Sequence, residues 1–84
     1  MHLERDLRQA IKNDELIVYY QPKIDFHNYQ VVGFEALVRW KHPTKGVLPP
    51  NLFIPIAEQT SLISDIGRVV ILQTAKQIKE WNKL

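Results

Sequence analysis

The segment from Phe34 to Trp40 is apolar except for Glu35 and Arg39. The β-branched, aromatic and other apolar residues in this stretch favour a β-strand. Because side chains on a strand alternate in direction, Glu35, Leu37 and Arg39 share one face. The opposite face is wholly apolar and is expected to pack in a core; it consists of Phe34, Ala36, Val38 and Trp40.

The residues before this stretch predict a helix and a hairpin. Apolar residues at helical spacing, from Leu3 to Ile11, predict a helix in which Glu4 can pair with Arg8 one turn later. The apolar run Leu16–Tyr20 predicts a strand that is buried on both faces. Residues 25–29 are then a polar hairpin loop, and Gln30–Trp40 is the second strand, antiparallel to the first.

Two further helices are expected after the hairpin. Residues 41–46 have the composition of a turn, and Pro50 suits the first turn of a helix, which Pro55 should kink or shorten. Thr60 and Ser61 are both candidate caps for a last helix over residues 62–83. The apolar stripe expected along that helix consists of Ile63, Ile66, Val70 and Trp81.

Composition limits the function classes. The chain has 84 residues, enough for one small domain at most, and its net charge of +2 is too small to indicate a DNA or RNA polymer or an anionic membrane as partner. There is no cysteine, which excludes disulfides and thiol catalysis, and no run long enough to span a bilayer. A cytoplasmic location is therefore expected for this segment, although other segments of a longer protein could anchor it to a membrane.

Glu35 and Arg39 have two interpretations. They could form a salt bridge on a half-exposed sheet, as part of a purely structural module. Alternatively, the face could look into an active site, because a carboxylate suits Mg²⁺ or Mn²⁺ and a guanidinium suits a phosphodiester. Their spacing alone does not choose between these interpretations.

The surroundings of Glu35-Ala36-Leu37 resemble one family. The matching motifs are Tyr20-Gln21-Pro22, Val32-Gly33-Phe34, Glu35-Ala36-Leu37-Val38-Arg39-Trp40, His42-Pro43 with Gly46 and Pro50, and Phe53-Ile54-Pro55-Ile56-Ala57-Glu58. Their order and spacing are similar to those of EAL domains, the bacterial cyclic di-GMP phosphodiesterases. Ser61 departs from the pattern, since the family usually has glycine there.

The resemblance implies an α/β fold: a TIM-like (β/α)₈ barrel whose first strand is antiparallel to the rest. A complete barrel needs about 250 residues, so residues 1–84 would be its N-terminal fragment, with a helix, a two-stranded hairpin and two helices. By resemblance, the complete domain hydrolyses cyclic di-GMP to linear pGpG with two Mg²⁺ or Mn²⁺ ions. The alternative is a truncated or degenerate domain that acts as a nucleotide- or protein-binding regulatory module.

The resemblance also implies roles for single residues. Glu35 would be a catalytic metal ligand, Leu37 would pack against the nucleotide and Arg39 would hold a phosphate. Gln21 would reach the ligand from the first strand, and Pro50 would border a guanine. Since the barrel stops after two strands, the isolated fragment is expected to be inactive and to self-associate through its uncovered surface.

Overall fold

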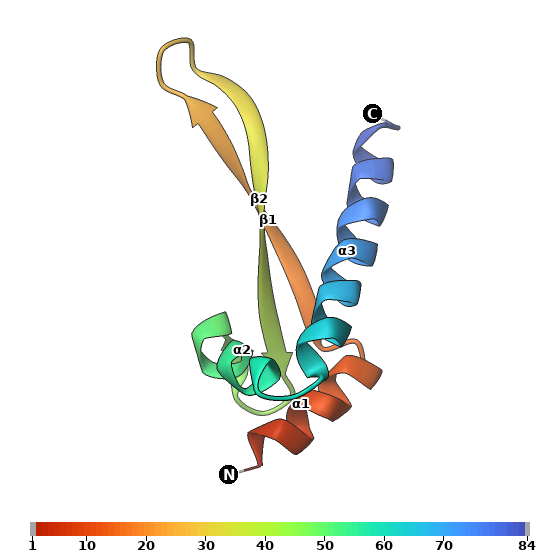
Figure 1. The fold of residues 1–84 in the computed structure, drawn as a ribbon. Helices are drawn as coiled ribbons and strands as arrows, with labels where there is room; N and C mark the ends of the chain where they lie inside the picture. Colours follow the sequence, from red (N-terminus) through yellow and green to blue (C-terminus); the bar gives the residue numbers. More distant parts are fainter. Residues whose placement is uncertain (1, 84) are drawn as a thin grey trace.

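The structure is a computed structural model that describes residues 2–83. Its elements are α1 (Leu3–Lys12), β1 (Leu16–Asp25), β2 (Gln30–His42), β3 (Gly46–Leu48), α2 (Pro50–Glu58) and α3 (Leu62–Trp81). The molecule is elongated, 48 × 26 × 24 Å, because the tip of the β1–β2 hairpin projects beyond the helices (Figure 1). The predicted order of a helix, an antiparallel hairpin and two helices is confirmed.

The hairpin is longer than the sequence predicts. β1 and β2 pair from Leu16 opposite Trp40 to Asp25 opposite Gln30, with a shift in register between Lys23 and Ile24. The expected first strand ended at Tyr20, before Pro22, but the strand continues through this proline. The proline is tolerated because of where its nitrogen points.

The ladder explains the position of Pro22. Lys41 N–H donates to the Glu15 carbonyl at 2.8 Å, so the odd-numbered residues that follow in β1 bond across to β2 and the even-numbered ones point to the open edge. Pro22, which lacks an N–H, is therefore on the edge side, where no ladder bond is lost. The sequence of β1 alone does not show which of its backbone N–H groups point to the open edge, so the continuation of the strand through Pro22 was not predicted.

A third strand was also missed. Residues 41–46 were expected to be a turn only, but β2 extends to His42, and β3 folds back so that His42 is opposite Gly46 and Trp40 is opposite Leu48. Gly46 has φ of +78°, a conformation that glycine adopts readily, and it closes this tight turn. The result is a three-stranded sheet in the order β1-β2-β3.

The core lies where the three helices meet one end of the hairpin (Figure 1). Trp40 and Phe53 are fully buried, and their rings meet edge to face with centroids 5.8 Å apart. Trp40 Nε1 also donates to Glu15 Oε1 at 3.1 Å, so the indole loses no hydrogen bond on burial. Within residues 2–83 the other buried apolar side chains are Leu7, Ala10, Leu16, Ala57, Leu62 and Ile66.

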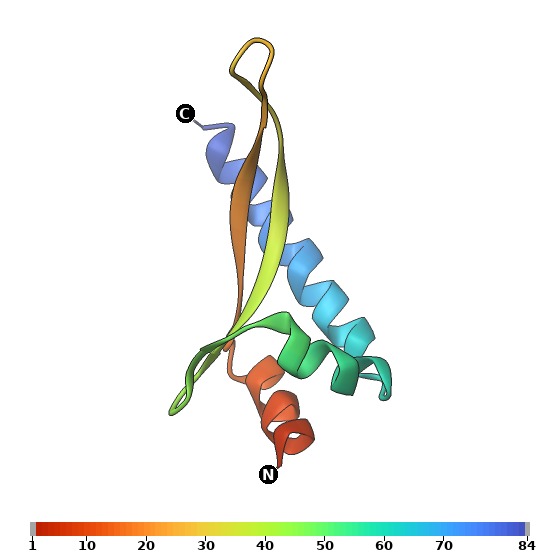
Figure 2. The same ribbon diagram turned by 90° about the vertical axis from the view of Figure 1, so that its left-hand side faces the viewer.

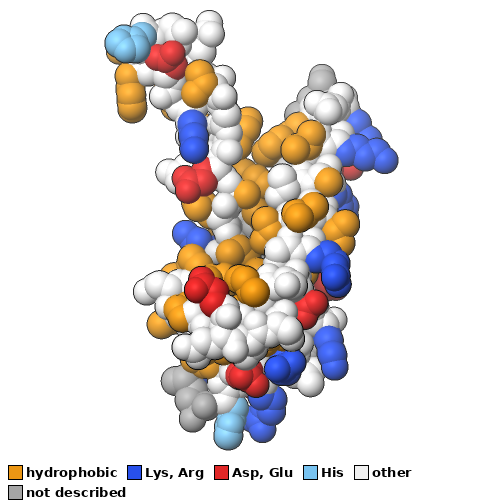
Figure 3. All heavy atoms as spheres, in the orientation of Figure 1, with side chains coloured by type: hydrophobic (Ala, Val, Ile, Leu, Met, Phe, Trp, Pro, Cys, Tyr) orange, Lys and Arg blue, Asp and Glu red, His pale blue; other side chains and the backbone are white. Residues whose placement is uncertain are grey.

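Helix α3 covers one face of the hairpin (Figure 2). Near its C-terminus, the ring of Trp81 contacts Tyr20 at 5.3 Å and Phe34 at 4.8 Å between centroids. Apolar side chains gather along this seam, whereas lysines and arginines lie on the outer side of α3 (Figure 3). Despite its 20 residues, α3 is too polar to cross a membrane, and no other helix in residues 2–83 is long and apolar enough to do so.

Some details of α2 and α3 differ from the expectation. α2 continues through Pro55 and ends at Glu58, and α3 ends at Trp81 rather than Lys83. Thr60 makes the cap-like contact, because its Oγ1 accepts a hydrogen bond from Leu62 N–H at 3.2 Å, while Ser61 makes no such bond. Ile63, placed on the apolar stripe, is 37% exposed, so that part of the stripe was wrong, whereas Ile66 is buried as expected.

Candidate functional site

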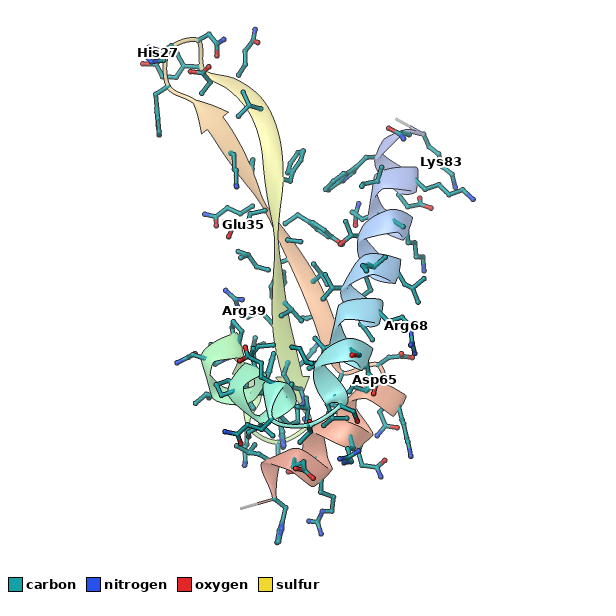
Figure 4. The ribbon with its side chains drawn as sticks, in the orientation of Figure 1. His27, Glu35, Arg39, Asp65, Arg68 and Lys83 are labelled. Atoms are coloured by element: carbon teal, nitrogen blue, oxygen red, sulfur yellow. The ribbon has the colours of Figure 1, made fainter. Side chains whose placement is uncertain are left out.

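One face of β2 carries the expected site residues Glu35, Leu37 and Arg39. Their alternation with buried or helix-facing residues follows from the strand itself, which runs without interruption from Gln30 to His42. The side chains of Glu35 and Arg39 both point away from α3, on the same side of the hairpin (Figure 4). The structure therefore separates a face that packs against a helix from a face that carries charge.

β1 adds three side chains to the same face. In the register, Gln21 lies opposite Glu35, Tyr19 opposite Leu37, and Ile17 opposite Arg39. Residues directly opposite each other on paired strands project to the same side, with their Cβ atoms about 5 Å apart. Gln21 therefore lies beside Glu35 on this face, and its role toward a ligand stays a prediction.

Tyr19 was missed as a candidate. It is 49% exposed and shares the face of Gln21 and Glu35. The signal was present, because Tyr19 and Gln21 are two residues apart on the same strand and must share a face. The apolar run Leu16–Tyr20 had been assigned to a strand buried on both faces, and that assignment hid the tyrosine.

The two charges do not neutralise each other. Within residues 2–83, Glu35 and Arg39 form no ion pair, so the interpretation as a structural salt bridge is wrong. The Arg39 guanidinium donates from Nη1 to the Val38 carbonyl at 2.9 Å and is half-buried, while Glu35 is exposed. Glu35 therefore remains free to accept a ligand, and Arg39 keeps further N–H groups for one.

Pro50 lies on another element. It is the first residue of α2, after Pro49 in extended conformation (φ −76°, ψ 158°), and it is half-buried. β3 pairs with the C-terminal end of β2, and the chain runs from β3 through Pro49 to Pro50. The structure thus groups Gln21, Glu35, Leu37 and Arg39 on one face, and it places Pro50 at the start of the helix that follows the sheet.

The described residues do not contain a complete metal site. Within residues 2–83, no group of three or more histidine, aspartate or glutamate side chains is arranged to hold a metal ion. Glu35 offers a carboxylate, and Gln21 opposite it offers an amide oxygen, both suitable donors for Mg²⁺. This donor set fits a hard divalent cation in part, since such an ion takes about six oxygen ligands.

Comparison with known proteins defines the class. The sequence model of the EAL domain matches residues 4–84. The chain is 50% identical over 82 residues to an uncharacterized signaling protein of Caulobacter vibrioides, covering 98% of this chain and 10% of that protein. It is 46% identical over 79 residues to the cyclic di-GMP phosphodiesterase PdeR of Escherichia coli, covering 94% of this chain and 12% of PdeR.

A solved structure agrees with this. The PaMucR phosphodiesterase in complex with c-di-GMP superimposes with a TM-score of 0.92 and 41% identity, covering 99% of this chain and 34% of that one. The chain belongs to the EAL domain family, and its fold is the first part of the TIM barrel seen in EAL domain structures. It spans about a third of the solved domain and about a tenth of the length of the curated relatives.

Proposed function

We propose that residues 1–84 form the N-terminal part of a domain that hydrolyses cyclic di-GMP to linear pGpG. The observation that carries the proposal is the face of Gln21, Glu35, Leu37 and Arg39, which points away from α3 and leaves both charges unpaired with each other. Membership of the EAL family supports it, because the named relative PdeR is a phosphodiesterase of this dinucleotide.

Arg39 holds a phosphate of the dinucleotide in this proposal. Its guanidinium is already oriented by the bond to the Val38 carbonyl, and its planar fork fits two phosphate oxygens. Leu37, half-buried between Glu35 and Arg39 on the same face, provides apolar contact for the ligand. Gln21 offers an amide beside Glu35, and Pro50 borders a guanine base from the start of α2.

Glu35 would be one ligand of a divalent cation, Mg²⁺ or Mn²⁺, with the remaining ligands supplied by parts of the domain beyond these residues. When bound, such cations supply a hydroxide nucleophile at neutral pH and stabilise charge that develops on the phosphate oxygens. Glu35 is suited to this because it is exposed, ionisable and free of an ion pair with Arg39. The isolated chain, with one carboxylate on this face, should bind Mg²⁺ weakly and should not turn over cyclic di-GMP.

Two measurements test this function. Purified 84-residue chain, free of complete enzyme, should show no hydrolysis of cyclic di-GMP. In a complete domain that contains these residues, Glu35→Gln keeps the shape but removes the charge, and turnover should fall at least about a hundredfold, since even residues that only support a metal ligand contribute ten- to a hundredfold. Near-normal turnover by Glu35→Gln, with an unchanged circular dichroism spectrum, would refute the assignment of Glu35 as a metal ligand.

We also propose that the isolated chain self-associates. Toward the tip of the hairpin, Val31 and Val32 are 55% and 66% exposed, and the outer edge of β1 has backbone groups that point away from β2. Exposed apolar surface beside an open strand edge favours pairing with another copy. Sedimentation velocity over a tenfold concentration range should show a rising average mass; a compact monomer throughout, with slowly exchanging strand amides, would contradict this.

A cytoplasmic location for the site is the last part of this proposal. It fits a chain without cysteine, since disulfides are common in proteins that function outside the cytoplasm. Protease added to intact cells should leave the segment uncut, and cleavage by external protease would refute the location.

A further inference from the structure

His42, at the C-terminal end of β2, has no place in the site described above, yet its side chain is only 9% exposed. Its ring lies against the buried Trp40, with centroids 5.2 Å apart. Its Nε2 atom is 3.7 Å from Asp6 Oδ2 of α1. A titratable side chain so enclosed, outside the expected active site, requires a physical reason.

The reason is visible at the other ring nitrogen. Nδ1 of His42 accepts hydrogen bonds from the backbone N–H groups of Thr44 and Lys45, both at 3.1 Å. An N–H donor needs a lone pair on its acceptor, so Nδ1 carries no proton and the neutral ring is protonated on Nε2. The imidazole therefore stabilises the turn by accepting backbone hydrogen bonds. An asparagine or aspartate side chain does the same when it bonds to the backbone two residues ahead.

The turn held by His42 leads directly to Pro50. Residues 43–45 join His42 to Gly46, and β3 has three residues before Pro49 and the start of α2. A strand of three residues contributes few ladder bonds of its own. The two bonds to Nδ1, together with the contact to Asp6, thus connect the turn to the core and to α1.

We propose that His42 is a positioning residue: as the Nε2–H tautomer it fixes the turn of residues 43–45, and through β3 it sets where Pro50 stands relative to the site face. The role given to Pro50 rests on the proposed function, whereas the role of His42 in the turn does not. In this account His42 touches neither nucleotide nor metal, and it acts through the backbone that follows it.

The neighbours of His42 define the controls. Asp6 on α1 faces Nε2 at 3.7 Å, whereas the two turn amides donate to Nδ1 on the other side of the ring. Glu15, between α1 and β1, lines a surface pocket together with His42 and Asp6, but it accepts its hydrogen bond from Trp40 Nε1. Lys41 precedes His42 and Lys45 lies in the turn, and both are exposed. Among residues 2–83, Asp6 is the one carboxylate within ion-pair distance of His42, so Asp6→Asn is a control that leaves the Nδ1 bonds intact.

A pair of isosteric variants separates the two nitrogens. Asn at position 42 places an oxygen where Nδ1 is, and Gln places its amide nitrogen where Nε2 is. In the 84-residue chain, His42→Asn should keep slow exchange at the Thr44 and Lys45 amides, whereas His42→Gln should speed exchange about tenfold, the effect of losing roughly one hydrogen bond. Nitrogen-15 spectra of the wild-type ring should show Nδ1 unprotonated and hydrogen-bonded.

Rescue by His42→Asn is the result that a purely space-filling role would not give. Equal exchange at the Thr44 and Lys45 amides in the Asn and Gln variants would overturn the proposal.

Enzyme kinetics then test the link to Pro50. In a complete domain, His42→Gln should raise KM for cyclic di-GMP several-fold, roughly as expected for loss of ground-state contacts, with kcat little changed, and His42→Asn should restore KM. Unchanged KM after faster turn exchange would refute the link from the turn to the nucleotide. Failure of the proposed function itself would be seen separately, as activity that survives Glu35→Gln.

Discussion

The two faces of the β1–β2 hairpin differ in what covers them. One face carries Trp40, which is fully buried, and Phe34, which contacts Trp81 of α3. The other carries Glu35, which is exposed, and Arg39, which is half-buried and forms no ion pair with it in residues 2–83. The same strand thus supplies the fold with one set of side chains and the proposed chemistry with the other.

The difference shows how a strand can tolerate charged residues in an apolar sequence. A side-chain period of two lets the packed face keep its apolar side chains while every second residue is free to be polar. Substitutions on the packed face should therefore change stability, and substitutions on the charged face should change binding and turnover. Variants that violated this division would show that the two faces are not independent.

The largest effect on stability is expected for Trp40→Ala. The indole is fully buried against Phe53 and His42, and truncating such a residue costs about 3 to 5 kcal/mol, close to the whole stability of many small domains. Urea unfolding followed by circular dichroism should show a largely unfolded chain. Trp81→Ala, at a half-buried position, is the matched control and should cost clearly less.

Gln73→Ala should have the next largest effect. This side chain of α3 acts on the outer edge of β1, where Oε1 accepts from Val18 N–H at 3.1 Å and Nε2 donates to the Leu16 carbonyl at 2.7 Å. Losing both bonds should lower the free energy of unfolding by about 1 to 3 kcal/mol. Lys76→Ala, at an exposed position of the same helix, should change it little, and equal effects of the two variants would contradict the role of Gln73.

Arg39→Ala should have the smallest effect on stability and a clear effect on binding. A phosphate contact acts in the ground state and the transition state alike, so KM for cyclic di-GMP in a complete domain should rise about tenfold or more while kcat changes less. Arg68→Ala, on α3 and away from the site face, is the control. A fall in kcat with unchanged KM would mean that Arg39 acts on the chemical step instead.

The sequence predicted the elements well where local pattern decides them. The side-chain period predicted which residues of β2 share a face, and the Glu4–Arg8 pair forms at 3.5 Å in α1. The expected core face was only partly right, because Trp40 is buried but Phe34 and Ala36 are exposed. Pro22 was missed because its place depends on a partner far along the chain: it could be placed only once the open edge of β1 was known. Tyr19 was missed for another reason, because the run Leu16–Tyr20 was assigned to a strand buried on both faces.

The site was predictable in part for the same reason. Glu35, Leu37 and Arg39 share a face by spacing alone, whereas Gln21 needed the pairing of the strands, and Pro50 depends on β3, which the turn-like composition of residues 41–46 concealed. The role of each residue in catalysis came from resemblance to EAL domains and stays a prediction. Residues outside this chain complete the barrel in the solved relative, so their contribution could not be read from these 84 residues.

One experiment tests the division between the faces most directly. The 84 residues contain no cysteine, so single cysteines can report on each face by their rate of thiol labelling in an otherwise cysteine-free complete domain. Tyr19→Cys reports on the charged face and Ala36→Cys on the packed face, and in this structure both positions are exposed. Saturating cyclic di-GMP should slow labelling of Tyr19→Cys strongly and leave Ala36→Cys unchanged. Protection of Ala36→Cys without protection of Tyr19→Cys would contradict the account.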